Sequence, residues 1–191
     1  IVAQSIPFEL RVLADESNIL SVSRSMFESK ETLNSISGQE YYDNYHSTHE
    51  VIPIRPPLFA FLVHISHGIF GYTPENAGRV NLVILGALLF LVYSWIEHYR
   101  GQMYGIIAVI LLISSPILAL CTRSAGFDLL SVFLLAQLFH AIRRYDNCQN
   151  RKRLWWVWIC LLLFCYARYE NLVLIPITLA YLFFRHRRYI R

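Results

Sequence analysis

Charged side chains that could perform acid–base or phosphate chemistry occur at four points of this chain. They are the adjacent pair Asp15 and Glu16, the single Arg55, the pair Arg123 and Asp128, and the pair Arg168 and Glu170. A carboxylate can act as a general base on a hydroxyl group, and an arginine can bind a phosphate through two parallel hydrogen bonds. If the neighbouring apolar stretches cross a membrane, all four points emerge at the same surface, which suggests a reaction site there.

The distribution of basic residues predicts the orientation of the chain in that membrane. The segment from Arg143 to Arg153 holds five basic residues and one acid, and the tail after Phe184 holds four basic residues and no acid. Lys and Arg concentrate in cytoplasmic loops, so both segments are expected inside and the four charged points outside. Residues 1–56 hold four basic residues against eight acids. The net charge of +4 therefore reflects membrane topology, and no nucleic-acid partner is expected.

Composition also favours a membrane protein. Apolar residues make up 55% of the chain and charged residues 16%, against about 25% charged residues in ordinary soluble domains. The expected fold class is all-α, a polytopic membrane helical bundle with a partly helical extracytoplasmic loop. Because the chain begins at Ile1 with no apolar span before the acidic segment, we expect it to be a fragment without its first transmembrane helix. The four cysteines are expected to be reduced.

Apolar runs predict one short surface helix and five spans. Residues 1–56 are expected to form the extracytoplasmic loop, and residues 57–191 the transmembrane region. The run 57–70 is short for a crossing that needs about 20 residues, so it is expected to be an interfacial helix. The expected spans are about 80–96, 103–121, 125–142, 154–167 and 171–184. One long helix over 154–184 is the alternative to the last two, but it would bury Arg168 and Glu170 near mid-bilayer.

Each charged position also has a purely structural interpretation. Asp15 and Glu16 could complement the dipole at a helix N-terminus. Asp128 could cap a helix, and this is as plausible as a functional role for an acid within an apolar span. Arg55 precedes two prolines that restrict its backbone, which would hold its guanidinium ready for a phosphate, or it could be an anchor at the interface. Arg168 and Glu170 could simply pair with each other.

Two further patterns bear on the chemistry. The spacing of His64 and His67 is compatible with a metal site, although such histidines beside aromatic residues are more typical of a membrane interface. The chain has no glycine-rich phosphate loop or dinucleotide fingerprint, so a mechanism driven by ATP or a nucleotide sugar finds no support.

Several short motifs occur in a fixed order along the chain: Arg11, Asp15, Glu16, the run 23–26, Arg55-Pro56-Pro57-Leu58-Phe59, Ile69-Phe70-Gly71, Arg79, the run 124–128 and the turn 168–171. This order resembles that of the GT-C membrane glycosyltransferases of the dolichyl-phosphate-mannose protein mannosyltransferase and aminoarabinose transferase type. The resemblance implies a polyprenyl-phosphate sugar donor, with transfer to a lipid, glycan or protein acceptor at the extracytoplasmic face. It places the enzyme in the plasma membrane if the source is bacterial.

The resemblance also implies roles for individual residues. Asp15, with Glu16 beside it, would be the catalytic carboxylate, and Arg55 would bind the donor phosphate. Asp128 would be a second-loop acid that contacts the acceptor or a metal. Arg168 could supply a second phosphate contact, because Ser17 and Asn18 stand where relatives often carry a basic residue. The cofactor is left open, with a divalent metal at Asp15 and Asp128 as one option.

Two other functional classes compete with the transferase. A multi-pass transporter or lipid flippase would favour polar groups near mid-bilayer and internal repeats, whereas the charges here cluster at the outer ends of the spans. A non-catalytic membrane scaffold would tolerate neutralisation of Asp15 and Asp128.

Overall fold

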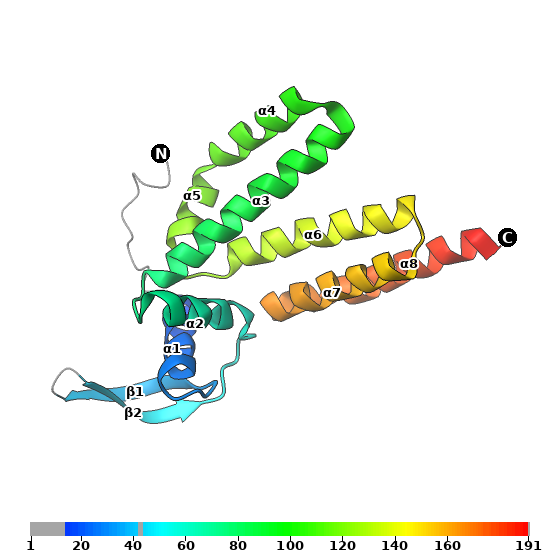
Figure 1. Ribbon diagram of the computed structural model, residues 1–191. Coiled ribbons are helices and arrows are strands. Elements are labelled where there is room, and N and C mark those ends of the chain that lie inside the picture. The colour runs from blue at the N-terminus through cyan, green and yellow to red at the C-terminus, as the bar shows by residue number, and fades with distance from the viewer. Residues whose placement is uncertain (1–13, 42–43, 191) are drawn as a thin grey trace.

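The computed structural model describes residues 14–41 and 44–190 (Figure 1). Helix α1 (Ala14–Glu28) is followed by a hairpin of strands β1 (Asn34–Tyr41) and β2 (Asn44–Val51). The remaining elements are α2 (Leu58–Phe70), α3 (Asn76–Arg100), α4 (Gln102–Ile113), α5 (Pro116–Arg123), α6 (Asp128–Asn147), α7 (Arg151–Ala167), the 3-10 helix η1 (Tyr169–Val173) and α8 (Leu174–Ile190). The long helices extend away from α1, α2 and the hairpin, which lie together at one end.

The predominantly helical fold agrees with the prediction, but the β-hairpin was not predicted. Sequence patterns indicated only short helices in residues 1–56, whereas β1 and β2 form an antiparallel pair with Asn34 opposite Val51. The strands are mostly polar and carry little apolar alternation, the signal on which strand prediction depends. Contacts with α1 support the hairpin instead, because the Ser35 amide donates to Ser21 Oγ (2.9 Å).

The predicted span 103–121 is wrong as a single helix. It is divided into α4 and α5, whose axes differ by 65°. Ser115 is extended (ψ 116°) and Pro116 opens α5, because a residue before proline avoids the helical region and proline has no amide hydrogen to donate. A tight turn at Gly101 joins α3 to α4: Gly101 has φ 93° and its amide donates to the Glu97 carbonyl (2.9 Å).

The other helices largely follow the predicted runs. Helix α2 occupies the expected interfacial segment, and α3 extends the expected span at both ends. Residues 151–190 do not form one long helix but are divided into α7, η1 and α8, because the backbone at Arg168 is extended (φ −156°, ψ 133°). This break keeps Arg168 and Glu170 at an end of the helices.

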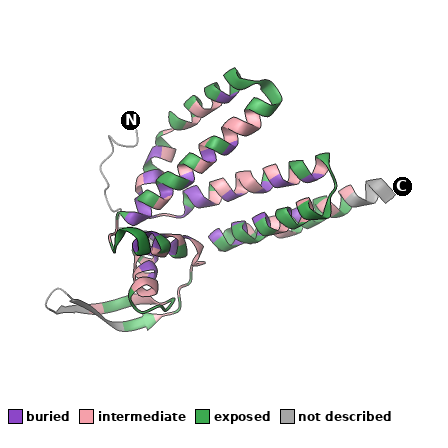
Figure 2. Cartoon of the chain, in the orientation of Figure 1, coloured by how far each residue is buried: buried purple, intermediate pink, exposed green. Residues whose placement is uncertain are grey.

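One helix of the described residues, α3, is long and apolar enough to cross a membrane, and the bent pair α4 and α5 adds a second if it is counted as one span. Exposed residues are distributed along all the long helices (Figure 2). Many of them are large apolar residues, among them Ile110 on α4 and Leu162 on α7, each about 60% exposed. Exposed apolar surface, where it is contiguous, marks a lipid or protein contact.

A buried hydrogen-bond chain connects α1, α2 and α3. The side chains of Ser23, His67 and Asn76 are fully buried. Asn76 Nδ2 lies 2.8 Å from His67 Nδ1, and His67 Nε2 lies 3.3 Å from Ser23 Oγ. Both ring nitrogens of His67 are therefore engaged, so a metal site built on His64 and His67 is not supported. All four cysteines are free thiols, as expected.

Candidate functional site

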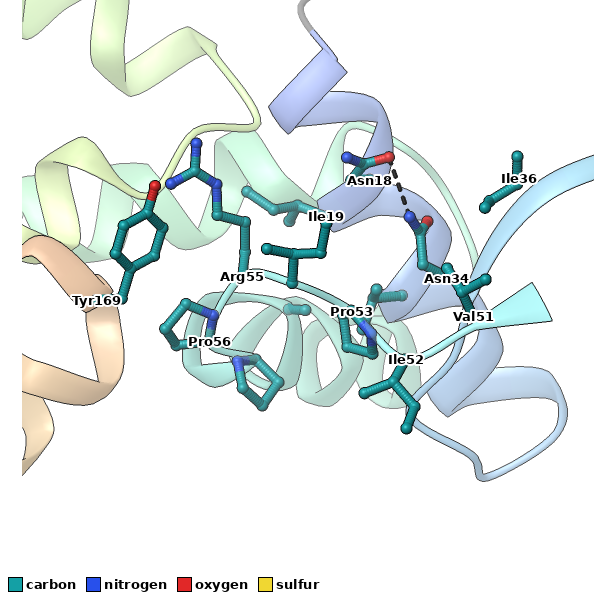
Figure 3. Close-up of a pocket in the computed structure, with 14 residues that line it drawn as sticks. Asn18, Ile19, Asn34, Ile36, Val51, Ile52, Pro53, Arg55, Pro56 and Tyr169 are labelled. Carbon is teal, nitrogen blue, oxygen red and sulfur yellow. Dashed lines mark hydrogen bonds between the residues drawn. The ribbon is translucent and has the colours of Figure 1, made fainter.

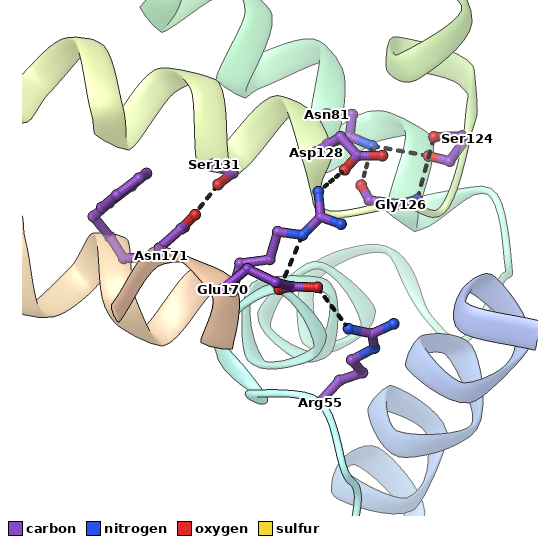
Figure 4. A network of polar contacts seen from close by, with 10 residues as sticks. Arg55, Asn81, Ser124, Gly126, Asp128, Ser131, Glu170 and Asn171 are labelled. Carbon is purple, nitrogen blue, oxygen red and sulfur yellow. Dashed lines mark hydrogen bonds and ion pairs between the residues drawn. The ribbon is translucent and has the colours of Figure 1, made fainter. Parts of the chain in front are cut away.

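Four charged side chains from distant parts of the sequence form one continuous ionic chain (Figure 4). Arg168 Nη1 donates to Asp128 Oδ1 at 2.7 Å, and Arg168 Nε donates to Glu170 Oε2 at 3.2 Å. The other carboxylate oxygen of Glu170 accepts from Arg55 Nη1 at 3.2 Å. The order along the chain is Asp128, Arg168, Glu170, Arg55. The structure thus brings together three of the predicted site residues, Arg55, Asp128 and Arg168, and connects them through Glu170.

The ends of helices position these four side chains. Asp128 is the first residue of α6, Arg168 follows the last residue of α7, and Glu170 lies in η1. Arg55 lies in the proline-containing segment that leads into α2. The ion pair described for Asp128 is with Arg168. The predicted pairing of Arg168 with Glu170 is present.

Two aromatic rings, which sequence reasoning did not single out, hold the arginines. The Arg55 guanidinium lies 4.9 Å from the centre of the Tyr169 ring and 5.8 Å from that of Phe127. Arg168 lies 5.1 Å from the centre of the Phe127 ring. Such contacts attract a cation to the ring face. They restrict the guanidinium groups while leaving about a quarter to a third of each side chain exposed, so a ligand can reach them.

The ionic chain is balanced, with two positive and two negative groups. The pKa of Glu170 is lowered, first by a hydrogen bond from its own backbone amide and then by the charge of Arg168 and the hydrogen bond from Arg55. Glu170 is therefore ionised near neutral pH. A phosphate that binds Arg55 or Arg168 would have to compete with this carboxylate.

Two asparagines hold the loop and the turn that carry the charges. Asn81 is fully buried in α3, and its Nδ2 donates to the carbonyls of Ser124 (2.8 Å), Gly126 (3.1 Å) and Cys121 (3.2 Å). Asn171 donates to Ser131 Oγ and to the Phe164 carbonyl, both at 2.8 Å. Sequence reasoning missed Asn81, although a polar residue in an apolar span is the signal that could have found it.

A pocket of about 430 Å³ lies beside the ionic chain (Figure 3). Its walls come from α1, the hairpin and the segment before α2. Arg55 and Tyr169 form the wall next to the ionic chain, and Asn18 and Ile19 form the α1 wall. The pocket therefore joins the charged groups to α1.

The acidic pair lies at the start of α1. Asp15 is the second residue of α1 and precedes Asn18 and Ile19, which line the pocket, by about one helical turn. Its side chain lies outside the described part of the structure. Glu16 is buried, with 4% of its surface exposed, and does not line the pocket.

The described residues do not fit the divalent metal that was one option at Asp15 and Asp128. Asp128 already contacts the Arg168 cation, and no group of three His, Cys, Asp or Glu side chains suited to a metal occurs among them. Asp15, the other expected ligand, has its side chain outside the described residues.

Comparison with known proteins agrees with the motifs. The family model described as dolichyl-phosphate-mannose-protein mannosyltransferase matches residues 54–191, more than two thirds of the chain. No curated protein and no solved structure matches the chain. The match includes Arg55, Asp128, Arg168 and Glu170, and it begins after the acidic pair. The chain therefore belongs to the dolichyl-phosphate-mannose-protein mannosyltransferase family of GT-C membrane glycosyltransferases.

Proposed function

We propose that this protein transfers a sugar from a polyprenyl-phosphate donor to an acceptor at the extracytoplasmic membrane surface. The observation that carries the proposal is the ionic chain from Asp128 to Arg55 beside a pocket whose other wall is α1. Membership of a glycosyltransferase family supports the same reaction class. In the membrane, α3 would be one span and the bent pair of α4 and α5 another. Helices α6, α7 and α8 would be further spans.

The donor phosphate is proposed to bind Arg55, with Arg168 as a second contact. As the bond between the anomeric carbon and the phosphate oxygen breaks, the phosphate leaves with the bonding electrons and gains negative charge. A fixed arginine stabilises that charge more in the transition state than in the ground state. Glu170 would then serve to hold both arginines in place when no donor is bound.

The acceptor is proposed to enter the pocket, where its hydroxyl oxygen attacks the anomeric carbon. Asp15 takes the hydroxyl proton as the new bond forms, which is the role of a general base. The apolar residues of the pocket would exclude water and so limit hydrolysis of the donor. The sugar and the acceptor class are not specified by these contacts.

The test is sugar transfer by the purified full-length protein in nanodiscs, with a polyprenyl-phosphate sugar as donor. Asp15→Asn removes the base while nearly preserving shape, so the rate should fall by at least about a hundredfold while donor binding persists. Glu28→Gln is the control, because Glu28 lies on the same helix and is exposed, and it should leave the rate within about twofold. Equal rates for wild type and Asp15→Asn would remove Asp15 from the mechanism. Absence of transfer with every lipid-linked sugar would favour a transporter.

A further inference from the structure

A second cavity, of about 570 Å³, lies at the opposite end of the helices from the ionic chain. Trp95 and His98 of α3 line one side, and His140, Arg144 and Asn147 of α6 line the other, with Arg153 of α7 completing it. His98 follows Asn81 by about 25 Å along α3, at 1.5 Å per residue. The cavity is therefore separate from the proposed transfer site.

The cavity is built for an anion. Arg144 and Arg153 both line it, and none of its lining residues is acidic. Arg153 Nη1 donates to the Arg144 carbonyl at 2.7 Å, which fixes one guanidinium at the mouth and leaves its other N–H groups available. Asp146 does not line this cavity, and its carboxylate already has two partners: Oδ2 accepts from the Tyr181 hydroxyl at 2.6 Å, and Oδ1 lies 3.4 Å from Arg185 Nε. Arginine suits a phosphate ester because its planar fork can form two parallel hydrogen bonds.

An apolar groove of about 420 Å³ adjoins this cavity and shares Trp95 with it. Leu138, Phe139 and Ile142 of α6 and Ile177 of α8 form most of its wall, and Arg143 and Asp146 lie at its edge with Tyr181. A basic cavity joined to an apolar groove suits a molecule with an anionic head and a hydrocarbon tail. A soluble phosphate would use only the basic cavity.

We propose that this composite site binds an anionic phospholipid, with its phosphate on Arg144 and Arg153 and an acyl chain in the groove beyond Trp95. The site lies at the end of the molecule where basic residues concentrate, so its cavity would lie at the level of lipid headgroups. This binding site is independent of the donor site and of the transfer reaction.

The test uses the full-length protein purified in detergent and titrated with phosphatidylglycerol, with bound lipid measured by native mass spectrometry. The double substitution Arg144→Gln with Arg153→Gln should weaken phosphatidylglycerol binding by about tenfold or more, because two charge-assisted hydrogen bonds are lost. The matched control is Arg151→Gln with Lys152→Gln, which removes the same charge from exposed neighbours that do not line the cavity. The control should change binding by less than about twofold.

Two further arms separate a lipid from a soluble anion. Trp95→Ala should weaken phosphatidylglycerol binding through loss of the groove, and inorganic phosphate should fail to displace the lipid at equal concentration. Phosphatidylcholine should bind more weakly than phosphatidylglycerol. If removal of Arg153 prevents folding, Arg144→Gln alone should still weaken binding by about threefold or more.

Three results would overturn the proposal. If both double variants weakened phosphatidylglycerol binding equally, the loss would reflect only the general attraction between positive charge and an anionic lipid. Displacement by inorganic phosphate at equal concentration would assign the cavity to a soluble anion. Equal binding of phosphatidylcholine would show that the arginines do not select the headgroup.

Discussion

Arg55 is the residue at which the ionic chain meets the pocket. It contacts Glu170 on one side and stacks near Tyr169 on the other. Its backbone is restricted by the two prolines that follow, which places the guanidinium before any ligand arrives. Such preorganisation reduces the cost of binding an anion. In the proposed reaction, Arg55 exchanges the Glu170 carboxylate for the donor phosphate.

Arg55→Ala is therefore expected to weaken donor binding and to slow turnover together. A hydrogen bond to a charged group contributes about 1.5–3 kcal/mol, so kcat/KM for the donor should fall by about tenfold to a hundredfold. Arg55→Lys should recover only part of the loss, because an ammonium group lacks the planar fork of donors. The measurement is steady-state transfer at varied donor concentration.

Arg100→Ala is the matched control for this measurement, because Arg100 is exposed at the far end of α3. Its kinetics should equal those of the wild type. Unchanged donor kinetics in folded Arg55→Ala protein would reduce Arg55 to an anchor at the interface.

At the scale of elements, the buried chain from Ser23 through His67 to Asn76 links α1 to α2 and α3. The orientation of the Asn76 amide is determined by its neighbours: Nδ2 also donates to the Gly71 carbonyl at 2.7 Å, and Oδ1 accepts from Arg79 at 3.0 Å. His67 Nδ1 must then accept a hydrogen bond, so the ring is neutral and its Nε2 donates to Ser23 Oγ. Ser23 in turn donates to the Leu20 carbonyl at 2.9 Å. This chain holds the helix that carries Asp15.

The fold is accordingly expected to lose stability in mild acid. The pKa of His67 is lowered by burial, and nearby His64 lowers it further. The unfolded chain then binds more protons than the folded one below about pH 6.5. The stability contribution of His67 is complete above that pH and declines as pH falls through the lower pKa of the folded state. Thermal unfolding of the purified protein between about pH 8 and 5 measures this decline.

His67→Gln should flatten this pH dependence, because glutamine does not titrate. It should also lower the melting temperature near neutral pH, because Ser23 or Asn76 would lose a hydrogen-bond partner. A buried polar group without a partner costs about 1–3 kcal/mol. His49→Gln is the control, because His49 is exposed on β2, and the acid sensitivity should persist in it. An unchanged pH profile in His67→Gln would assign the sensitivity to another group.

For the whole molecule, the charges lie at opposite ends of the helices. The ionic chain lies at one end, and the basic residues of the α6–α7 turn lie at the other (Figure 1). Because basic loops stay in the cytoplasm, this polarity predicts that the transfer site faces outward. The α6–α7 turn would then lie inside.

Cysteine labelling in sealed cells tests this orientation. In a cysteine-free protein, a cysteine at Glu50 should react with an impermeant thiol reagent from outside, and one at Asn150 should not. Both positions are exposed, whereas Thr122 at the end of α5 is fully buried and would be a poor probe. The native Cys148 is also exposed and must be replaced. Labelling of position 150 in sealed cells would show that the orientation is the opposite of the one predicted. Labelling of the same position after permeabilisation is the control for its accessibility.

Local features of the sequence determined much of this protein. Apolar runs longer than a few helical turns predicted α2, α3, α6, α7 and α8, because helix formation depends on residues close in sequence. The break at Arg168 was also predicted, since a single long helix would carry charges into its middle. The motifs around Arg55 and Asp128 indicated the family. Neither the hairpin nor the bend before Pro116 was predicted, because weak alternation and a proline each permit more than one local structure.

Apart from the local pair of Arg168 and Glu170, only the tertiary structure decided which charged groups meet. Asp128 and Arg168 are 40 residues apart, and Arg55 and Glu170 are 115 residues apart, so no local pattern relates them. The partner of Asp128 depends on where α6 begins and α7 ends in space, and those positions depend on the hydrogen bonds of Asn81 and Asn171. The sequence alone shows which residues are charged. Its distance from the next charge, which sets their mutual energy, depends on how the helices are packed.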